Sequence, residues 1–235
     1  MKDTPAILAA TLALAVLVSA ALLRSAFLVW KPPHLLRAGR FVEARRAAER
    51  LERSWLRVLP GIRLTSQWTL ACALHFEGDL EGSLARIAEL ASKLPPAVRD
   101  SSAVMEAANL VLLDRDADRA ATLLATARSP EDLLLRALAT ARAGRPDEAD
   151  RLYRAAGKTH PSPQRHQAAM FHFLRGAYLV EVGRSLEAEG DLARAANGHQ
   201  HDTVYVARAR ALLDATAPSP DEEPSSLAPQ TVERG

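Results

Sequence analysis

The chain has 235 residues, of which 30 are basic and 28 acidic, and its formal net charge is +2. This balance argues against a strongly basic nucleic-acid-binding protein, and the single cysteine excludes a disulfide framework and a multi-thiolate metal site. Hydrophobic residues make up 48% of the chain but aromatic residues only 5%. That composition favours packed helices over a β-sandwich, so the sequence predicts an all-α protein.

Residues 1–32 are predicted to form an N-terminal transmembrane anchor. The run from Pro5 to Leu23 carries no charge, and as a helix it would span about 28 Å, close to the thickness of a bilayer's hydrocarbon core. Pro32 and Pro33 are expected to stop this helix. The alternative is a cleaved signal peptide, because small residues at 18–21 offer cleavage sites.

The flanking charges predict a single-pass protein of the inner (cell) membrane whose larger part faces the cytoplasm. Four basic residues follow the apolar run at positions 24–40, whereas Lys2, offset by Asp3, precedes it. The positive-inside rule places the more basic flank in the cytoplasm. Trp30 and Lys31 suit the headgroup region, and a lipid on an N-terminal cysteine is excluded because the sole cysteine is Cys72.

Residues 33–216 are predicted to form a series of helical pairs. Apolar residues recur at helical spacing, and proline breakers divide the chain into units of about thirty to forty residues. A short turn inside each unit is centred on Gly39, Gly78, Arg115, Gly144 and Gly183. Glycine supplies the left-handed conformation that ends a helix. At the third turn, Asp114 or Asp116 is expected to supply it instead of Arg115.

Small residues recur at fixed distances from these turns, where helices must approach closely. Five residues after each turn stand Ala44, Ser83, Ala120, Ala149 and Ala188, and seven before the last four stand Ala71, Ala108, Ala137 and Gly176. This pattern resembles the tetratricopeptide repeat (TPR), a helix–turn–helix unit of about 34 residues. The resemblance covers about residues 33–200 and implies a TPR-like α-solenoid. An irregular helical bundle is the alternative.

The C-terminal part is predicted to contain a capping helix followed by a disordered tail. Residues 201–215 form the expected helix, with Val204, Ala207, Ala211 and Leu212 along its packed side. The tail, residues 217–235, is rich in Pro, Ser and acidic residues, which is typical of disorder.

The sequence offers no pattern typical of an enzyme. It has no glycine-rich phosphate loop, and His166 and His172 are six residues apart, which does not suit a metal pair on one helix face. Cys72 lies among apolar neighbours and is expected to be buried and inert. We therefore expect no catalysis, metal, cofactor, nucleic acid or small-molecule substrate. The basic run from Arg37 to Arg57 is interpreted as a solvated helix face or a surface attracted to anionic lipids.

The TPR resemblance implies that the first helix of each unit lines a concave face that receives a protein or peptide partner. Carried over by distance from each turn, the candidate partner-binding residues are Trp68, His75, Phe76, Met105, Asn109, Leu134, Leu138, Arg142, Phe173 and Glu181. Only Asn109 and Arg142 suit the capture of a C-terminal carboxylate, which argues against that use. The alternative is that this face is ordinary core or is covered by the chain's own end helix.

Two hypotheses of function follow. The first is a membrane-tethered, non-enzymatic scaffold or adaptor that binds a protein or peptide partner. The second is a holding chaperone or assembly factor on the envelope side of the membrane, which binds unfolded or apolar segments through the same face. The sequence does not decide between them.

Overall fold

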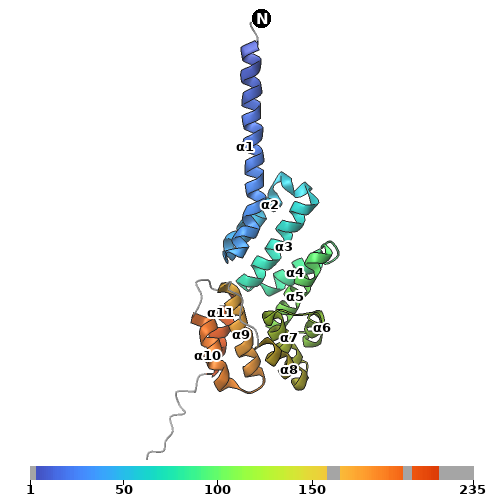
Figure 1. Ribbon diagram of the computed structural model, residues 1–235, viewed down its shortest axis with the longest axis vertical. Coiled ribbons are helices and arrows are strands. Elements are labelled where there is room, and N and C mark those ends of the chain that lie inside the picture. Colours follow the sequence, from blue (N-terminus) through green and yellow to red (C-terminus); the bar gives the residue numbers. More distant parts are fainter. Residues whose placement is uncertain (1–3, 158–164, 198–202, 217–235) are drawn as a thin grey trace, which may run out of the picture.

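The computed structural model describes residues 4–157, 165–197 and 203–216, and within these ranges helices joined by short turns occur without any strand (Figure 1). This confirms the all-α prediction. The elements are α1 (Thr4–Arg37), α2 (Phe41–Arg53), the 3-10 helix η1 (Trp55–Val58), α3 (Pro60–Glu77), α4 (Leu80–Leu90), α5 (Pro96–Leu112), α6 (Ala117–Leu123), α7 (Pro130–Arg142), α8 (Pro146–Ala156), α9 (Arg165–Glu181), α10 (Ser185–Asn197) and α11 (Val204–Thr216). The predicted tail at 217–235 lies outside the described residues.

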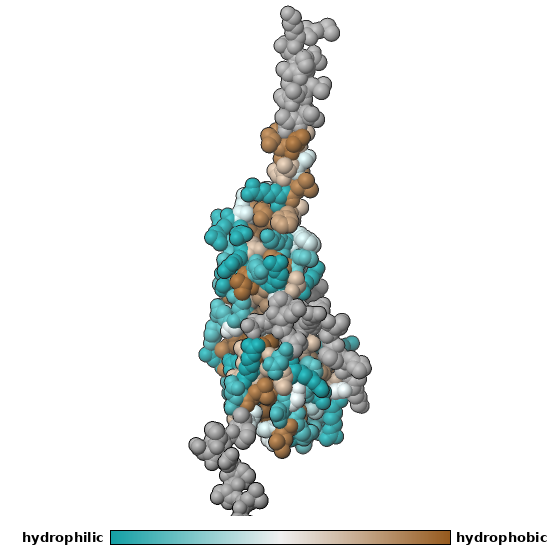
Figure 2. All heavy atoms as spheres, turned by 90° about the vertical axis from the view of Figure 1, so that its left-hand side faces the viewer, coloured by the Kyte–Doolittle hydropathy of each residue, from teal (hydrophilic) through white to brown (hydrophobic). Residues whose placement is uncertain are grey.

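Helix α1 is long and apolar enough to cross a membrane, and most of it projects from the helical domain (Figure 1). The part of α1 that is coloured in Figure 2 carries mainly apolar side chains, whereas the visible face of the domain is mainly hydrophilic. The prediction that Pro32 and Pro33 stop the helix is wrong, because α1 continues through both to Arg37. Its last turn packs Leu35 against Ala44 and Ala47 of α2, and this packing offsets the backbone hydrogen bonds that the prolines cannot donate. The helical domain therefore already includes the last turns of α1.

The five predicted turns share one hydrogen-bond pattern. At the first, the Gly39 N–H donates to Leu36 and the Arg40 N–H donates to Leu35, and the four turn glycines all have positive φ, from 73° to 91°. This is the Schellman arrangement that satisfies the last carbonyls of a helix.

At the third turn the left-handed residues are aspartates. Asp114 (φ 55°) and Asp116 (φ 41°) both have positive φ, while Arg115 does not, so the predicted substitution of an aspartate is confirmed. The Asp114 N–H donates to Val111 as each turn glycine does to its own helix, but α6 begins one residue later than the other second helices. Distances counted back from Arg115 are therefore one residue out of register in α5.

The small residues that follow the turns are all buried. Ala44, Ser83, Ala120, Ala149 and Ala188 each have no exposed surface. Gly176 is also essential to close packing, because a Cβ atom there would lie 2.7 Å from the Leu192 side chain. Short side chains thus bring the two helices of each pair together, as the sequence predicted.

Successive helices pack as pairs, and each pair contacts the first helix of the next pair. The end helix α11 departs from a simple linear array, because it contacts α10 and α9 and also reaches back to α3 (Figure 1). A linear repeat protein makes contacts between neighbouring repeats alone. A regular TPR-like solenoid remains a prediction, while the structure shows a helical domain that its last helix partly closes.

The buried side of α11 differs from the predicted one. Val204 is buried and Leu212 half-buried, but Ala207 and Ala211 are exposed, and Tyr205 is fully buried in their place. The large aromatic ring gains far more from burial than alanine does. It is also placed to act as a polar contact, as described below.

Candidate functional site

The ten candidate residues come from the first helices of four pairs. Helix α3 supplies Trp68, His75 and Phe76, α5 supplies Met105 and Asn109, α7 supplies Leu134, Leu138 and Arg142, and α9 supplies Phe173 and Glu181. Five of them, His75, Asn109, Leu134, Leu138 and Phe173, are at most 4% exposed. Helix α11 lies against α3 and α9 at this face, so these five side chains do not reach an external partner in this arrangement.

A chain of buried hydrogen bonds joins α11 to helices α3, α5 and α4. His75 Nε2 lies 2.8 Å from the Tyr205 hydroxyl, and His75 Nδ1 lies 2.7 Å from Asn109 Oδ1. Asn109 Nδ2 donates to the Ser83 hydroxyl, which in turn donates to the Ala71 carbonyl. Since Asn109 Oδ1 can only accept, His75 carries its proton on Nδ1 and accepts from Tyr205 on Nε2.

The surroundings of His75 keep the imidazole neutral. Burial lowers its pKa to about 4, and the hydrogen bond to Asn109 opposes this only in part. The same burial raises the pKa of the Tyr205 hydroxyl. At neutral pH the chain therefore consists of neutral groups with every bond directed one way, and it acts as a structural latch between α11 and α3.

Aromatic rings pack around this latch. The Tyr205 ring lies 5.6 Å from Phe173 and 6.2 Å from Phe76, and Phe76 stacks on Phe41 at 4.3 Å between ring centroids. Tyr205 thus links α11 with α9 and α3. Its role was missed in the sequence because its partner His75 is 130 residues away, a separation that no local pattern reveals.

Arg142 and Glu181 form a polar clamp at the other end of the face. Arg142 donates to Glu181 at 2.9 Å and to the Val111 carbonyl at 2.6 Å, and it also lies 3.3 Å from Asp114. Arg208 of α11 donates to the neighbouring Leu112 carbonyl. These two guanidinium groups satisfy carbonyls at the end of α5, where a positive charge is favourable. Arg142 is therefore already engaged within the protein.

An open groove remains beside the latch. Trp68, Phe76, Val104, Met105 and Met170 supply its apolar lining, and each of these side chains is half-buried. The groove encloses about 570 Å³ and includes Asp100, Glu131 and Asp132. Of its described lining residues, none is a lysine or arginine and His75 is neutral. Trp68, Phe76 and Met105 are thus the apolar candidates that the structure leaves accessible.

Burial raises the pKa of Asp132, although a hydrogen bond with Ser129 acts in the opposite direction. Ser129 caps the N-terminus of α7, where its hydroxyl accepts the Asp132 backbone N–H. Glu131 and Asp132 therefore lie in the first turn of α7, where the helix dipole favours their negative charge.

A buried carboxylate joins α10 to α9. Asp191 lies 2.9 Å from His172 Nδ1 and 3.1 Å from Arg175 Nε, so His172 has a partner within the protein. The side chain of His166 lies outside the described residues. No group of three or more metal-ligating side chains occurs in the described ranges.

Cys72 is buried, as predicted, and desolvation raises the pKa of its thiol to about 12. A thiol that stays protonated is a poor nucleophile. The prediction that Cys72 is a buried core residue is therefore confirmed.

Neither a protein-family model nor a curated protein nor a solved structure matches this chain. The function is therefore inferred from the geometry of the chain itself.

Proposed function

We propose that this protein is a membrane-tethered helical adaptor that binds the amphipathic helix of a partner protein and catalyses no reaction. Helix α1 acts as an uncleaved anchor, and the helical domain presents the binding groove. The observation that carries this proposal is the open groove of Trp68, Phe76 and Met105, which remains accessible where α11 does not cover the face. The TPR resemblance, with its concave peptide-binding face, is consistent with this use.

The groove favours a particular partner chemistry. Its apolar floor suits the apolar stripe of a helix, which presents side chains at i, i+3, i+4 and i+7. Asp100 and Asp132 stand at its border with no cation among the described lining residues, so lysines or arginines beside that stripe would be attracted. We therefore expect a basic amphipathic helix rather than a C-terminal carboxylate.

Site-specific photo-crosslinking in cells tests this proposal. A photo-reactive amino acid replaces Met105 in the groove, and the matched control carries it at Leu186, which is 92% exposed on α10. We expect one crosslinked product of defined mass at position 105, lost on Trp68→Ala or Asp100→Lys, and absent at position 186. Identical products at both positions, or a product at 105 that survives both substitutions, would contradict the groove as the binding site.

Phe173→Ala does not test the groove. Phe173 is 4% exposed and packs against Tyr205, so truncation would open a core cavity and destabilise the domain. Accessible groove residues are the better reporters.

Membrane orientation separates the adaptor from the chaperone alternative. The basic residues that follow the apolar run favour a cytoplasmic domain. We therefore expect that a reporter enzyme that works only in the cytoplasm is active when fused after Gly235. A reporter that works only on the other side of the membrane is expected to be inactive there. Cleavage of the domain by external protease in intact cells would contradict this orientation and favour the envelope-side holding chaperone.

A further inference from the structure

We infer that the tip formed by Trp55–Leu59 docks into the anionic membrane surface beside the anchor, and that the adjoining cationic pocket holds lipid headgroups. This inference rests on the proposed anchoring of α1 and goes beyond it. It assigns a second, peripheral membrane contact that fixes the orientation of the domain.

The tip concentrates exposed apolar side chains. Beyond α1, five large hydrophobic side chains of the described residues are exposed, and three of them, Trp55, Val58 and Leu59, lie within this short segment. Trp55 and Val58 are each 70% exposed. Such a cluster is costly in water, and tryptophan is the side chain best suited to a membrane–water interface.

The fold places this tip at the level where α1 would leave the membrane. Helix α2 has 13 residues and runs back along α1 from the Gly39 turn, so its end lies about 20 Å nearer the anchor. Helix α1 is exposed from Leu14 through Arg24 and first becomes half-buried at Ser25. Figure 1 shows the segment between α2 and α3 on the side of the domain toward which α1 projects. The tip therefore lies near Arg24, where the uncharged run ends.

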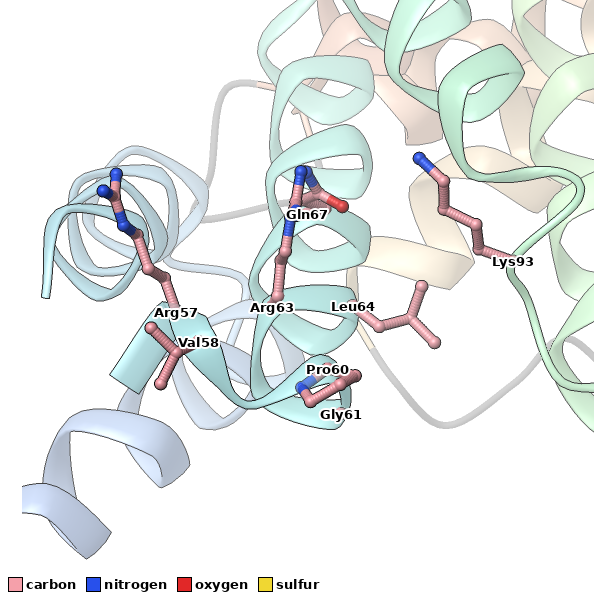
Figure 3. Close-up of a pocket in the computed structure, with 8 residues that line it drawn as sticks. All are labelled: Arg57, Val58, Pro60, Gly61, Arg63, Leu64, Gln67 and Lys93. Carbon is pink, nitrogen blue, oxygen red and sulfur yellow. The ribbon is translucent and has the colours of Figure 1, made fainter. Parts of the chain in front are cut away.

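A cationic pocket lies directly beside the tip. Arg57, Arg63 and Lys93 line it together with Val58 and Leu64, and it encloses about 400 Å³. Figure 3 shows Val58 and Pro60 at one end of the pocket, while the charged ends of the three cations extend toward the other. Because α3 begins at Pro60, the apolar end faces the anchor. Apolar side chains nearest the bilayer with cations behind them match the order of hydrocarbon and phosphate in a lipid surface.

The charges of this pocket are not neutralised within the described part of the protein. No ion pair is formed there by Arg57, Arg63 or Lys93, and Glu52 is the carboxylate that lines the adjoining hollow. Three arginines elsewhere in the basic run do form ion pairs: Arg40 with Glu43, Arg45 with Glu77 and Arg53 with Glu49. An external anion is the partner that these three cations lack, and anionic lipid is the anion that the neighbouring anchor brings close.

The test uses the full chain in phosphatidylcholine vesicles with and without phosphatidylglycerol. One variant, Trp30→Phe/Trp68→Phe, keeps Trp55 as its sole tryptophan, and the matched control, Trp30→Phe/Trp55→Phe, keeps Trp68. Quenching by lipids brominated near the headgroup reports contact with the bilayer. We expect Trp55 to be quenched several-fold more than Trp68, and more strongly when phosphatidylglycerol is present.

Flotation with the vesicles distinguishes failure of the inference from failure of the anchor. Vesicles that do not carry the protein would overturn both, whereas flotation with equal quenching of Trp55 and Trp68 would overturn the docking alone. Arg57→Gln/Arg63→Gln is expected to abolish the increase caused by phosphatidylglycerol, and Arg151→Gln on the distant helix α8 is expected to preserve it. If inorganic phosphate at constant ionic strength abolishes the increase, the pocket binds phosphate ions and the lipid assignment is wrong.

Discussion

Acidification is expected to weaken the latch between α3 and α11. The pKa of His75 is about 4 in the folded protein because the ring is buried, and the ordinary value is 6.5. The unfolded chain therefore takes up the proton first as pH falls, and the free energy of unfolding decreases between these two values. From these pKa values we expect a loss of about 2 kcal/mol at about pH 5 relative to neutral pH. That is a substantial part of the stability of a typical domain.

Urea unfolding of the full chain in non-ionic detergent micelles, followed by far-ultraviolet circular dichroism, measures this loss. The comparison is with His75→Gln, whose side chain keeps hydrogen-bonding capacity without titrating. Other histidines and carboxylates contribute equally to both proteins, so the difference in pH dependence isolates His75. The stability of the variant should change less with pH by about 2 kcal/mol. Parallel pH profiles would refute the assignment of a neutral, buried His75.

Two pairs of substitutions test the close packing of α9 with α10. Gly176→Ala would place Cβ 2.7 Å from the Leu192 side chain, so urea unfolding should show a loss of about 1–3 kcal/mol. Gly190→Ala meets nothing within 4 Å and should gain about 0.5–1 kcal/mol, and a gain at both sites would contradict the packing argument. Asp191→Asn removes a buried charge that pairs with Arg175 and contacts His172 and should cost about 1–3 kcal/mol, whereas Glu189→Gln on the exposed side should be nearly neutral.

Local rules predicted the helix pairs well because each turn depends on residues close in sequence. Gly78 ends α3 with a positive φ, a conformation that would strain a residue with a side chain. Ser83 follows five residues later, at the position where the two helices touch. The exchange of glycine for Asp114 was also predictable, since aspartate tolerates the left-handed region better than most residues. The extra residue in that turn had no such signal, and it shifted the register of α5.

The candidate site was less predictable because its state depends on contacts between distant segments. The spacing of Leu134 and Leu138 is the same whether a face is open or covered, and here both are buried. Whether the face is open or covered depends on Tyr205, because its hydroxyl can be buried only with His75 as a hydrogen-bond partner. Similarly, the prolines of α1 suggested a helix end, but packing of Leu35 on α2 maintained the helix. Tertiary contacts overrode local preference in both cases.

The two proposed surfaces together constrain where the partner comes from. Helix α3 begins at Pro60 beside the membrane tip and carries Trp68 and Phe76 of the groove. At 1.5 Å per residue, these side chains lie about 12 and 24 Å from the start of α3. A helix with its side chains is about 10–12 Å wide, so one bound in the groove would clear the lipid headgroups. If the partner is itself a membrane protein, an extended linker of at least about four residues must connect its membrane segment to its binding helix, so that the helix reaches from the lipid headgroups to the groove. Shortening such a linker below that length should abolish binding, whereas a soluble partner would be indifferent to it.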